Sequence, residues 1–338
     1  MDASVTLTLG VVGCGAIAHW HLDAIDRAGA PIRVTAAIDP DRANAIRLAE
    51  RTGAASYASL TDALVDRAFD AVLIAVPHHL HEAIACEALA AGVHVLLEKP
   101  LAPTLDACDR ILAAARAAGT VFMVAENAQY WPEVQTVADL LADGVIGDVV
   151  TARAATFFPA IDEFYGGDQP WRLDRAAAGG GVAIDTGSHW LRPLRVWLGE
   201  VAEVVAALGH PYPGMEGESL CRALLRFESG VVASFDAMLT TGAIAPQPLF
   251  TVTGSTGEIT VEGSGWVKLW DGSEFKGTKV GDRGGYLASY EGEWLDFAAA
   301  VVNGQAPAAT AEYALGELRC ALAMYRSAET QHWERVWG

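Results

Sequence analysis

Basic residues are scarce in this sequence of 338 residues, which has 23 Lys and Arg against 42 Asp and Glu and a formal net charge of −19. A field of that sign repels phosphate backbones and anionic lipid headgroups, so nucleic acid and membrane surfaces are poor candidates for partners. Charged residues make up only 19% of the chain, whereas hydrophobic residues make up 52%. That balance excludes a disordered chain, and the length predicts two domains with substantial cores.

Cysteine is also rare. The five cysteines are an odd number, lie far apart and form no C-x-x-C pair, which indicates reduced thiols rather than a disulfide framework or a structural zinc site. Two uncharged stretches, 3–22 and 237–257, are long enough to be considered as membrane spans. The first contains three glycines and no basic segment before it, and the second contains two prolines, so neither resembles a signal peptide or a spanning helix. We therefore expect a cytoplasmic protein.

The first 125 residues repeat one pattern, a short apolar run followed by a turn and an Ala- and Leu-rich amphipathic stretch. The apolar runs predict strands at 7–12, 34–38, 71–76, 94–97 and 121–125, with helices between them. Strands that are apolar throughout and separated by helices are typical of a parallel sheet covered on both faces. We predict an α/β domain with a doubly wound parallel sheet over residues 1–125.

The pattern changes after residue 126. Segments of alternating hydrophobicity predict strands at 149–158, 220–227, 231–238 and within 250–261. A helical pattern spans 176–198, and the tail is helical again from 291 to 329. We predict a second α/β domain, 126–338, with a large, mostly antiparallel open sheet. Its C-terminal helix is free to pack back on the first domain.

A glycine-rich loop, Gly13-Cys14-Gly15, joins the first predicted strand to the first predicted helix. Gly13 permits a tight turn, and Gly15 lets the backbone approach a pyrophosphate. The helix begins near Ala16 and Ile17, whose N–H groups are then available to bind that anion. The loop therefore predicts a Rossmann domain that binds a dinucleotide.

An acidic residue lies where such a domain binds the adenosine ribose. Asp39 ends the second predicted strand, about 20 residues after the glycines, and a carboxylate there accepts hydrogen bonds from the ribose hydroxyls. The same charge disfavours a 2′-phosphate, so we predict NAD in preference to NADP. Arg42, three residues on, leaves NADP open.

Two further clusters follow later strands of the predicted parallel sheet. They are Pro77-His78-His79-Leu80-His81 and Glu98-Lys99-Pro100. Ligands bind at the carboxyl ends of such strands, so Pro77, His78, His81, Glu98 and Lys99 are expected at the nicotinamide half of the cofactor. Three histidines within four residues leave metal ligation open as an alternative, but no carboxylate or thiolate partner is evident, and we predict no metal. Lys99 is either a solvated strand end or a donor to a substrate oxygen.

A third cluster, residues 179–190, contains three consecutive glycines followed by Asp185 and His189. If a helix begins here, Asp185 and His189 lie on one face, four residues apart. An Asp–His pair works as an oriented acid–base unit, although a helix-surface ion pair is an equally ordinary interpretation. Three glycines in a row carry an entropic cost, so we interpret them as leaving space for a ligand.

Taken together, these motifs resemble the Gfo/Idh/MocA oxidoreductase family, which includes glucose–fructose oxidoreductase and inositol dehydrogenase. The resemblance covers nearly the whole chain, and its motifs are the glycine loop, 76–81, 91–102, 126–132, Trp171-Arg172, 179–189 and 325–329. It implies a C-terminal domain that often mediates oligomerisation, so we expect a homodimer or homotetramer. It also places Asn127 among the cofactor-binding residues.

The resemblance implies a catalytic trio of Lys99, Asp185 and His189. His189 would exchange the hydroxyl proton, Lys99 would hydrogen-bond the reacting oxygen, and Asp185 would orient substrate and His189. Hydride would pass between the substrate carbon and nicotinamide C4.

The substrate-binding residues are expected to be the trio together with Tyr130, Trp131, Tyr165, Arg172 and Arg192. Many relatives have Asn at position 78, Arg at position 129 and Asp at position 192, where this chain has His78, Gln129 and Arg192. An acid replaced by a guanidinium changes which substrate group is held. For Arg172, a helix-cap contact is the alternative to binding cofactor or substrate.

These inferences predict an NAD-dependent oxidoreductase that interconverts a secondary hydroxyl of a sugar, glycoside or cyclitol with a ketone. Two alternatives remain open in the sequence. One is a hydrolase or lyase that keeps and recycles bound NAD, and the other is a non-catalytic NAD-sensing protein.

Overall fold

The computed structural model describes residues 6–159, 162–166, 170–242, 244–280 and 286–338. The chain divides into two compact units. Unit 1 comprises the described residues of Met1–Glu126 together with Tyr290–Leu315, and unit 2 comprises Asn127–Ser289 and Gly316–Gly338. The segment Tyr290–Leu315 therefore clusters with the N-terminal part of the chain.

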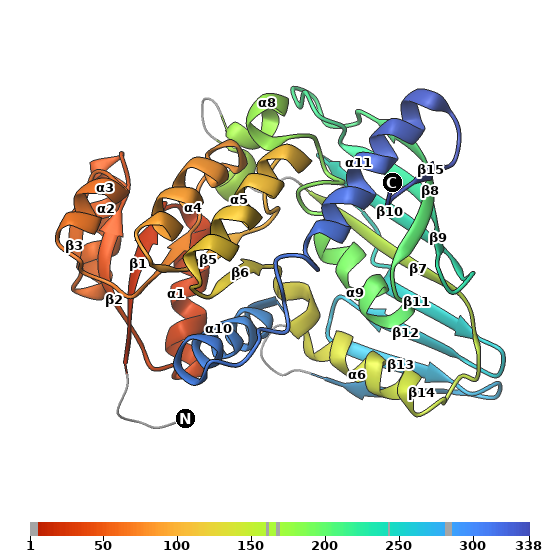
Figure 1. Cartoon of the computed structure of the whole chain (residues 1–338). Helices are drawn as coiled ribbons and strands as arrows, with labels where there is room; N and C mark the ends of the chain where they lie inside the picture. Colours follow the sequence, from red (N-terminus) through yellow and green to blue (C-terminus); the bar gives the residue numbers. More distant parts are fainter. Residues whose placement is uncertain (1–5, 160–161, 167–169, 243, 281–285) are drawn as a thin grey trace. The chain divides into compact units, whose positions relative to one another are not determined.

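Unit 1 is built around a parallel sheet, sheet A, which has six strands among the described residues in the order β3-β2-β1-β4-β5-β6 (Figure 1). This is the Rossmann order, with its reversal between β1 and β4. The strands are β1 Leu7–Val12, β2 Ile32–Ile38, β3 Ala55–Tyr57, β4 Ala71–Ile74, β5 His94–Glu98 and β6 Phe122–Ala125. Every residue of β4 is buried, as the uninterrupted apolar run predicts for a strand covered on both faces.

The helices of unit 1 alternate with these strands. They are α1 Ala16–Ala28, α2 Arg42–Thr52, α3 Leu60–Val65, η1 His78–Leu80, α4 His81–Ala90, α5 Leu105–Ala118 and most of α10 Tyr286–Asn303. The buried face of α1 carries Ala18, Leu22 and Ile25, and it also carries His21. A histidine in that position needs polar partners, which are described below.

Unit 2 contains sheet B, in which nine strands can be traced within the described ranges, in the order β14-β13-β12-β11-β7-β10-β9-β8-β15 (Figure 1). Neighbours are antiparallel except β7 and β10, which are parallel. The strands are β7 Val149–Pro159, β8 Val201–Gly209, β9 Leu220–Phe227, β10 Val232–Thr240, β11 Pro248–Gly254, β12 Glu258–Glu262, β13 Trp266–Trp270, β14 Phe275–Lys279 and β15 Glu334–Arg335. The predicted fold class, a doubly wound sheet followed by a large, mostly antiparallel sheet, is confirmed.

The helices of unit 2 are η2 Asn127–Tyr130, α6 Pro132–Ala142, α7 Asp162–Tyr165, η3 Trp171–Leu173, α8 Arg175–Ala178, α9 Ser188–Leu198 and α11 Leu315–Thr330. Along β9, Cys221, Leu225 and Phe227 are buried, whereas Arg222 and Leu224 on the other face are exposed. Within this unit α9 packs on β7, and α11 contacts β9 through Met324 and Cys221.

Two predicted helices are interrupted. The pattern over 176–198 corresponds to α8 and α9, and residues 179–187 between them form bends and turns. The helical tail likewise consists of α10 and α11 with a non-helical segment, 304–314, between them. Glycine explains the first interruption, because Gly179 ends α8 with a φ of +85°.

No helix among the described residues is both long enough and apolar enough to cross a membrane.

Candidate active site

The glycine loop follows β1 at the carboxyl edge of sheet A, as predicted. Gly13 has a φ of +87°, and a Cβ atom there would lie 2.3 Å from the backbone oxygen of Ala75. Gly15 has an ordinary φ of −80°, and no described atom lies within 4 Å of a Cβ built on it. Gly15 is also the N-cap of α1, where the described residues provide no side-chain cap. The loop therefore has space and helix N–H groups for an anion at Gly15, Ala16 and Ile17.

The two glycines provide a matched test. We expect Gly13→Ala to lower the midpoint of thermal unfolding by several degrees, since a positive φ costs about 1–3 kcal/mol in a non-glycine residue and the methyl group meets Ala75. We expect Gly15→Ala to unfold like the wild type but to bind NAD at least about tenfold more weakly. Differential scanning fluorimetry and an NAD titration measure these two quantities. Wild-type NAD affinity in Gly15→Ala would show that the pyrophosphate does not approach this residue.

Asp39 follows β2 and contacts the glycine loop directly. Its Oδ2 accepts the backbone N–H of Cys14 at 2.8 Å, and its Oδ1 accepts that of Asp41 at 2.8 Å. A carboxylate has about four acceptor positions, so two N–H donors leave capacity for ribose hydroxyls. Arg42 is the first residue of α2 and is exposed.

The Cys14 thiol is buried against this carboxylate. Burial, and to a smaller extent the charge of Asp39, raises the pKa of Cys14 to about 12. The thiol therefore stays protonated near neutral pH. All five cysteines are free thiols.

The histidines after β4 differ in their surroundings. His79 is exposed, His78 is buried beside Pro77, and His81 is fully buried. The His81 ring has Nδ1 at 2.9 Å from the oxygen of Pro100 and Nε2 at 3.1 Å from the oxygen of Val76. Burial lowers the pKa of His81, and the two carbonyl contacts oppose that shift. These contacts explain His81 as a tie between the segments that follow β4 and β5.

Lys99 follows β5, is partly exposed, and is linked to Pro100 by a cis peptide bond. Glu98 before it is mostly buried, and its Oε2 accepts the backbone N–H of Lys99 at 3.0 Å. The other oxygen, Oε1, lies 2.8 Å from Nε2 of His21. Sequence reasoning missed His21, although a histidine on the apolar face of a predicted helix was a visible signal.

In unit 2 the structure brings Tyr165, Arg172 and Asp185 together. Nε of Arg172 lies 3.2 Å from Oδ2 of Asp185, and the Tyr165 hydroxyl lies 3.5 Å from the same oxygen. The Arg172 guanidinium also stacks on Trp171, 4.3 Å from the ring centroid. Burial, followed by the charge of Asp185, raises the pKa of Tyr165 far above its ordinary value. Tyr165 is therefore a hydroxyl donor near neutral pH, and Asp185 is held by a cation and a phenol.

Asp185 is not on a helix, contrary to the helical spacing expected from the sequence. It lies in consecutive turns that lead into α9, and His189 is the second residue of α9. The backbone N–H of His189 donates to the oxygen of Thr186 at 3.2 Å. Both side chains are buried, with exposed fractions of 6% and 4%.

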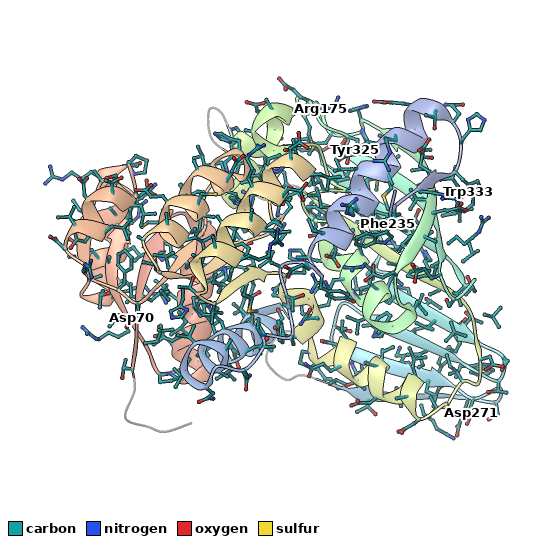
Figure 2. The ribbon with its side chains drawn as sticks, viewed as in Figure 1. Asp70, Arg175, Phe235, Asp271, Tyr325 and Trp333 are labelled. Atoms are coloured by element: carbon teal, nitrogen blue, oxygen red, sulfur yellow. The ribbon has the colours of Figure 1, made fainter. Side chains whose placement is uncertain are left out.

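Gly180 and Gly181, two of the three glycines before Asp185, do not leave open space, which corrects the interpretation from sequence. A Cβ at Gly180 would lie 2.2 Å from the Tyr325 hydroxyl, and one at Gly181 would lie 1.9 Å from the Glu218 backbone oxygen. Tyr325, on α11 (Figure 2), accepts the N–H of Gly181 at 3.1 Å and donates to Glu218. Burial raises the pKa values of Glu218 and Tyr325. The glycines therefore allow close packing beneath the segment that carries Asp185.

Arg192 lies within a buried ion-pair cluster of unit 2. Its guanidinium binds Glu317 with two hydrogen bonds, at 2.7 and 3.0 Å, and also donates to the side-chain oxygen of Gln129. Glu317 also accepts from Arg195, whose guanidinium pairs with Glu200 as well. Arg192 is fully buried, so these contacts explain it as a structural cation that orients Gln129. The substrate contact expected for Arg192 from the sequence stays a prediction.

Trp131 is, like Arg192, a buried residue of unit 2 that was expected to bind substrate. It is 6% exposed, and its ring packs edge-on against Trp190 at 5.5 Å and near Phe250 at 6.4 Å. Aromatic packing therefore fixes the Trp131 ring, and the substrate contact expected for Trp131 stays a prediction. Tyr130 is partly exposed, whereas Asn127 is fully buried and donates to Ser289 Oγ at 2.8 Å.

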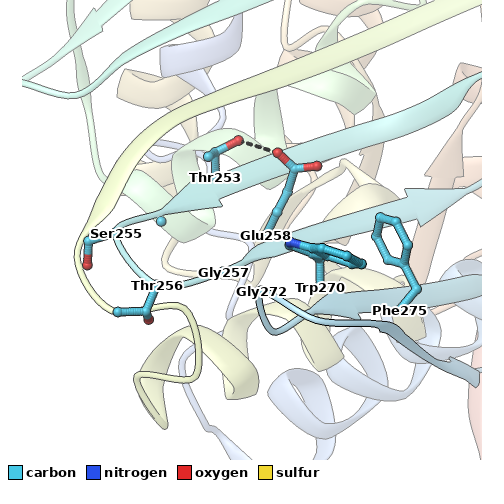
Figure 3. Close-up of a pocket in the computed structure, with 9 residues that line it drawn as sticks. Thr253, Ser255, Thr256, Gly257, Glu258, Trp270, Gly272 and Phe275 are labelled. Carbon is cyan, nitrogen blue, oxygen red and sulfur yellow. Dashed lines mark hydrogen bonds between the residues drawn. The ribbon is translucent and has the colours of Figure 1, made fainter.

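A pocket of about 530 Å³ lies on sheet B and contains none of these residues (Figure 3). It is formed by the turn between β11 and β12 and by Trp270 and Phe275, whose rings lie 5.1 Å apart. Its carboxylate, Glu258, accepts a hydrogen bond from Thr253 at 2.7 Å. Lys99, Asp185 and His189 are not among the residues that line this pocket, so the proposed chemistry is not placed there.

Two protein-family models match this chain. Residues 7–126 match the oxidoreductase family described as Gfo/Idh/MocA with an NAD-binding Rossmann fold, and residues 134–260 match a Gfo/Idh/MocA C-terminal domain. The chain therefore belongs to the Gfo/Idh/MocA family and is an oxidoreductase with an NAD-binding Rossmann domain.

Relatives with assigned names include sugar and cyclitol enzymes. The chain is 33% identical over 237 residues to a 1,5-anhydro-D-fructose reductase of Ensifer adhaerens, covering 69% of each chain. It is 34% identical over 164 residues to an inositol 2-dehydrogenase of Corynebacterium glutamicum (strain R), covering 48% of this chain and 49% of that one. The fold matches a levoglucosan dehydrogenase in complex with NADH and levoglucosan, with a TM-score of 0.88, 23% identity and coverage of 99% and 100% of the two chains.

Proposed function

We propose that this protein oxidises a secondary hydroxyl of a sugar, glycoside or cyclitol to a ketone, or reduces the ketone, with NAD as the hydride carrier. One observation carries the proposal: the loops that follow β1, β2 and β5 at the carboxyl edge of sheet A carry, in turn, a helix N-terminus with space at Gly15 and no side-chain cap from the described residues, the Asp39 carboxylate, and Lys99. Those are an anion site, a ribose acceptor and a cationic donor. The relatives named for anhydrofructose and inositol support the substrate class.

Bound NAD supplies a nicotinamide C4 that accepts or releases a hydride. The N–H groups of Gly15, Ala16 and Ile17 would bind its pyrophosphate, and Asp39 would accept the ribose hydroxyls. That carboxylate disfavours a 2′-phosphate, which is why we propose NAD rather than NADP, with Arg42 beside it as the residue that could offset the preference. The remaining predicted cofactor contacts stay predictions; they are Pro77, His78, His81, Glu98, Lys99 and Asn127.

The proton chemistry is assigned to Lys99 and His189. His189 would take the hydroxyl proton during oxidation, and Lys99 would hydrogen-bond the oxygen as it becomes a carbonyl. Asp185 would orient His189 and the substrate. The contacts of Asp185 with Arg172 and Tyr165 support this role, because they hold the carboxylate in one position.

Substrate selection is assigned to Tyr130, Tyr165 and Arg172, and to Gln129 through Arg192. A guanidinium only donates, so Gln129 must present its oxygen to Arg192, which leaves its NH₂ group for other acceptors. A substrate hydroxyl or carboxylate is a suitable acceptor. The predicted homodimer or homotetramer stays a prediction.

The function is tested by screening hexoses, glycosides, sugar acids, sugar phosphates and inositols with NAD, and 1,5-anhydro-D-fructose with NADH. We expect the reduced-nicotinamide absorbance to change stoichiometrically with substrate, faster with NAD than with NADP. Product formation without net change in that absorbance would contradict a dehydrogenase and favour recycled, bound NAD. The matching NADP assays show which cofactor the protein prefers.

A further inference from the structure

A buried histidine connects α1 and α10 to the segment that carries Lys99. His21 is fully buried, and its Nε2 lies 2.8 Å from Oε1 of Glu98. Its Nδ1 lies 3.0 Å from the indole nitrogen of Trp294. The Tyr290 ring packs edge-on against the imidazole, 4.8 Å between centroids. All of these residues belong to unit 1.

The Trp294 contact determines which ring nitrogen of His21 carries the proton. An indole N–H only donates, so Nδ1 of His21 must accept and must be unprotonated. The proton then lies on Nε2, which donates to Glu98. The second carboxylate nearby, Glu293, is 3.8 Å from Nδ1, which is too long for a hydrogen bond. His21 is therefore a neutral imidazole with a defined tautomer.

Glu98 transmits this constraint to Lys99. One of its oxygens accepts from His21, and the other accepts the backbone N–H of Lys99 at 3.0 Å. On the far side of Lys99, the oxygen of Pro100 lies 2.9 Å from Nδ1 of His81. Two buried histidines thus contact the segment around Lys99. His21 acts through Glu98 on one side, and His81 contacts the Pro100 oxygen on the other.

We propose that His21, in the tautomer set by Trp294, is a positioning residue for Lys99. The proposal rests on the catalytic role of Lys99 given above. Without His21 the buried Glu98 carboxylate loses a hydrogen-bond donor and moves to recover one, since an unsatisfied buried carboxylate is costly. Because Glu98 and Lys99 are adjacent, such a movement displaces the Lys99 backbone. A displacement of about 1 Å at a catalytic group can cost roughly 100-fold in rate.

The kinetic test compares variants of the full chain on the best substrate of the panel above. We expect His21→Leu to lower kcat roughly 10- to 100-fold, with KM and NAD affinity within about threefold of wild type. His21→Gln keeps one acceptor and one donor at the end of the side chain, so we expect it to recover part of the loss. His19→Leu, on the same helix, removes a histidine that contacts Arg51 instead, and we expect wild-type kcat.

The tautomer is tested without turnover, by ¹⁵N NMR of histidine-labelled protein. We expect the wild-type His21 signal to report a neutral ring protonated at Nε2, and Trp294→Phe, which keeps an aromatic ring but has no N–H, to lose that fixed tautomer. Because this measurement uses the wild type and Trp294→Phe, it tests the proposal even if His21→Leu does not fold. A wild-type His21 that is doubly protonated or protonated at Nδ1 at pH 7 overturns the proposal.

The outcomes separate this inference from the proposed function. If Lys99→Ala retains turnover, the catalytic role of Lys99 is wrong. If Lys99→Ala loses turnover while a folded His21→Leu retains it, or if His21→Gln is no better than His21→Leu, the positioning role is wrong and the function stands.

Discussion

Replacing Lys99 with alanine is expected to lower kcat for oxidation of the best polyol substrate by roughly 10²–10⁴-fold. The Lys99 ammonium is the cationic donor assigned to the reacting substrate oxygen. With alanine at position 99, that oxygen has no such donor while its charge changes during the reaction. Lys99 is only partly buried and lies after β5, so the fold should survive. The circular dichroism spectrum should match wild type. An NAD titration should still show binding, because the pyrophosphate and ribose contacts are on other loops, and any loss of affinity measures the nicotinamide contact predicted for Lys99.

Lys276→Ala is the control for this substitution, since Lys276 is an exposed lysine that pairs with Asp271 in unit 2. It should leave kcat unchanged. His189→Asn should lose turnover on a similar scale to Lys99→Ala, and the double variant should lose little more than the worse single one, because groups that act on one proton transfer are not additive. Full additivity of the two losses would argue that Lys99 and His189 serve separate steps.

The second large effect concerns stability. Glu317→Gln is expected to lower the free energy of unfolding by about 3–5 kcal/mol, because it leaves the buried guanidiniums of Arg192 and Arg195 without their shared carboxylate. Arg192→Gln should cost less, since Glu317 then still pairs with Arg195. Urea unfolding followed by tryptophan fluorescence measures both.

The matched control is Glu82→Gln on α4. Glu82 also accepts two hydrogen bonds from an arginine, from Nε and Nη2 of Arg110, but this arginine is exposed. Solvent screens this pair, so we expect no measurable change in the urea midpoint. Equal losses in the buried and exposed pairs would show that burial does not control the strength of these ion pairs.

Much of the fold was predictable because its signals are local. The strand at 7–12 was placed at its observed bounds, and the parallel character of sheet A followed from uninterrupted apolar runs. Short or exposed strands were missed, such as β3 and β14, since they lack an apolar run. The helix over 176–198 was drawn too long because alanine-rich stretches continue a helical pattern through glycines that end it.

The candidate site was predictable only in part. Motif spacing identified the loop at Gly13, the carboxylate of Asp39 and the lysine after β5, because each lies at the end of a strand. It gave no information on what each side chain contacts. Trp131 and Arg192 were expected at the substrate, and that stays a prediction; the aromatic packing of Trp131 and the ion pair of Arg192 within unit 2 could not be predicted from the motifs.

The amino-acid sequence by itself determined the class of each sheet, the dinucleotide-binding loop and the chemical types available for catalysis, because hydrophobic period and turn residues act over a few neighbours. Only the tertiary structure decided that Glu317 neutralises Arg192 from 125 positions away, that Tyr325 fills the space at Gly180, and that His21 holds Glu98 beside Lys99. Buried polar groups must find partners wherever the folded chain brings them, and the local pattern does not record that path.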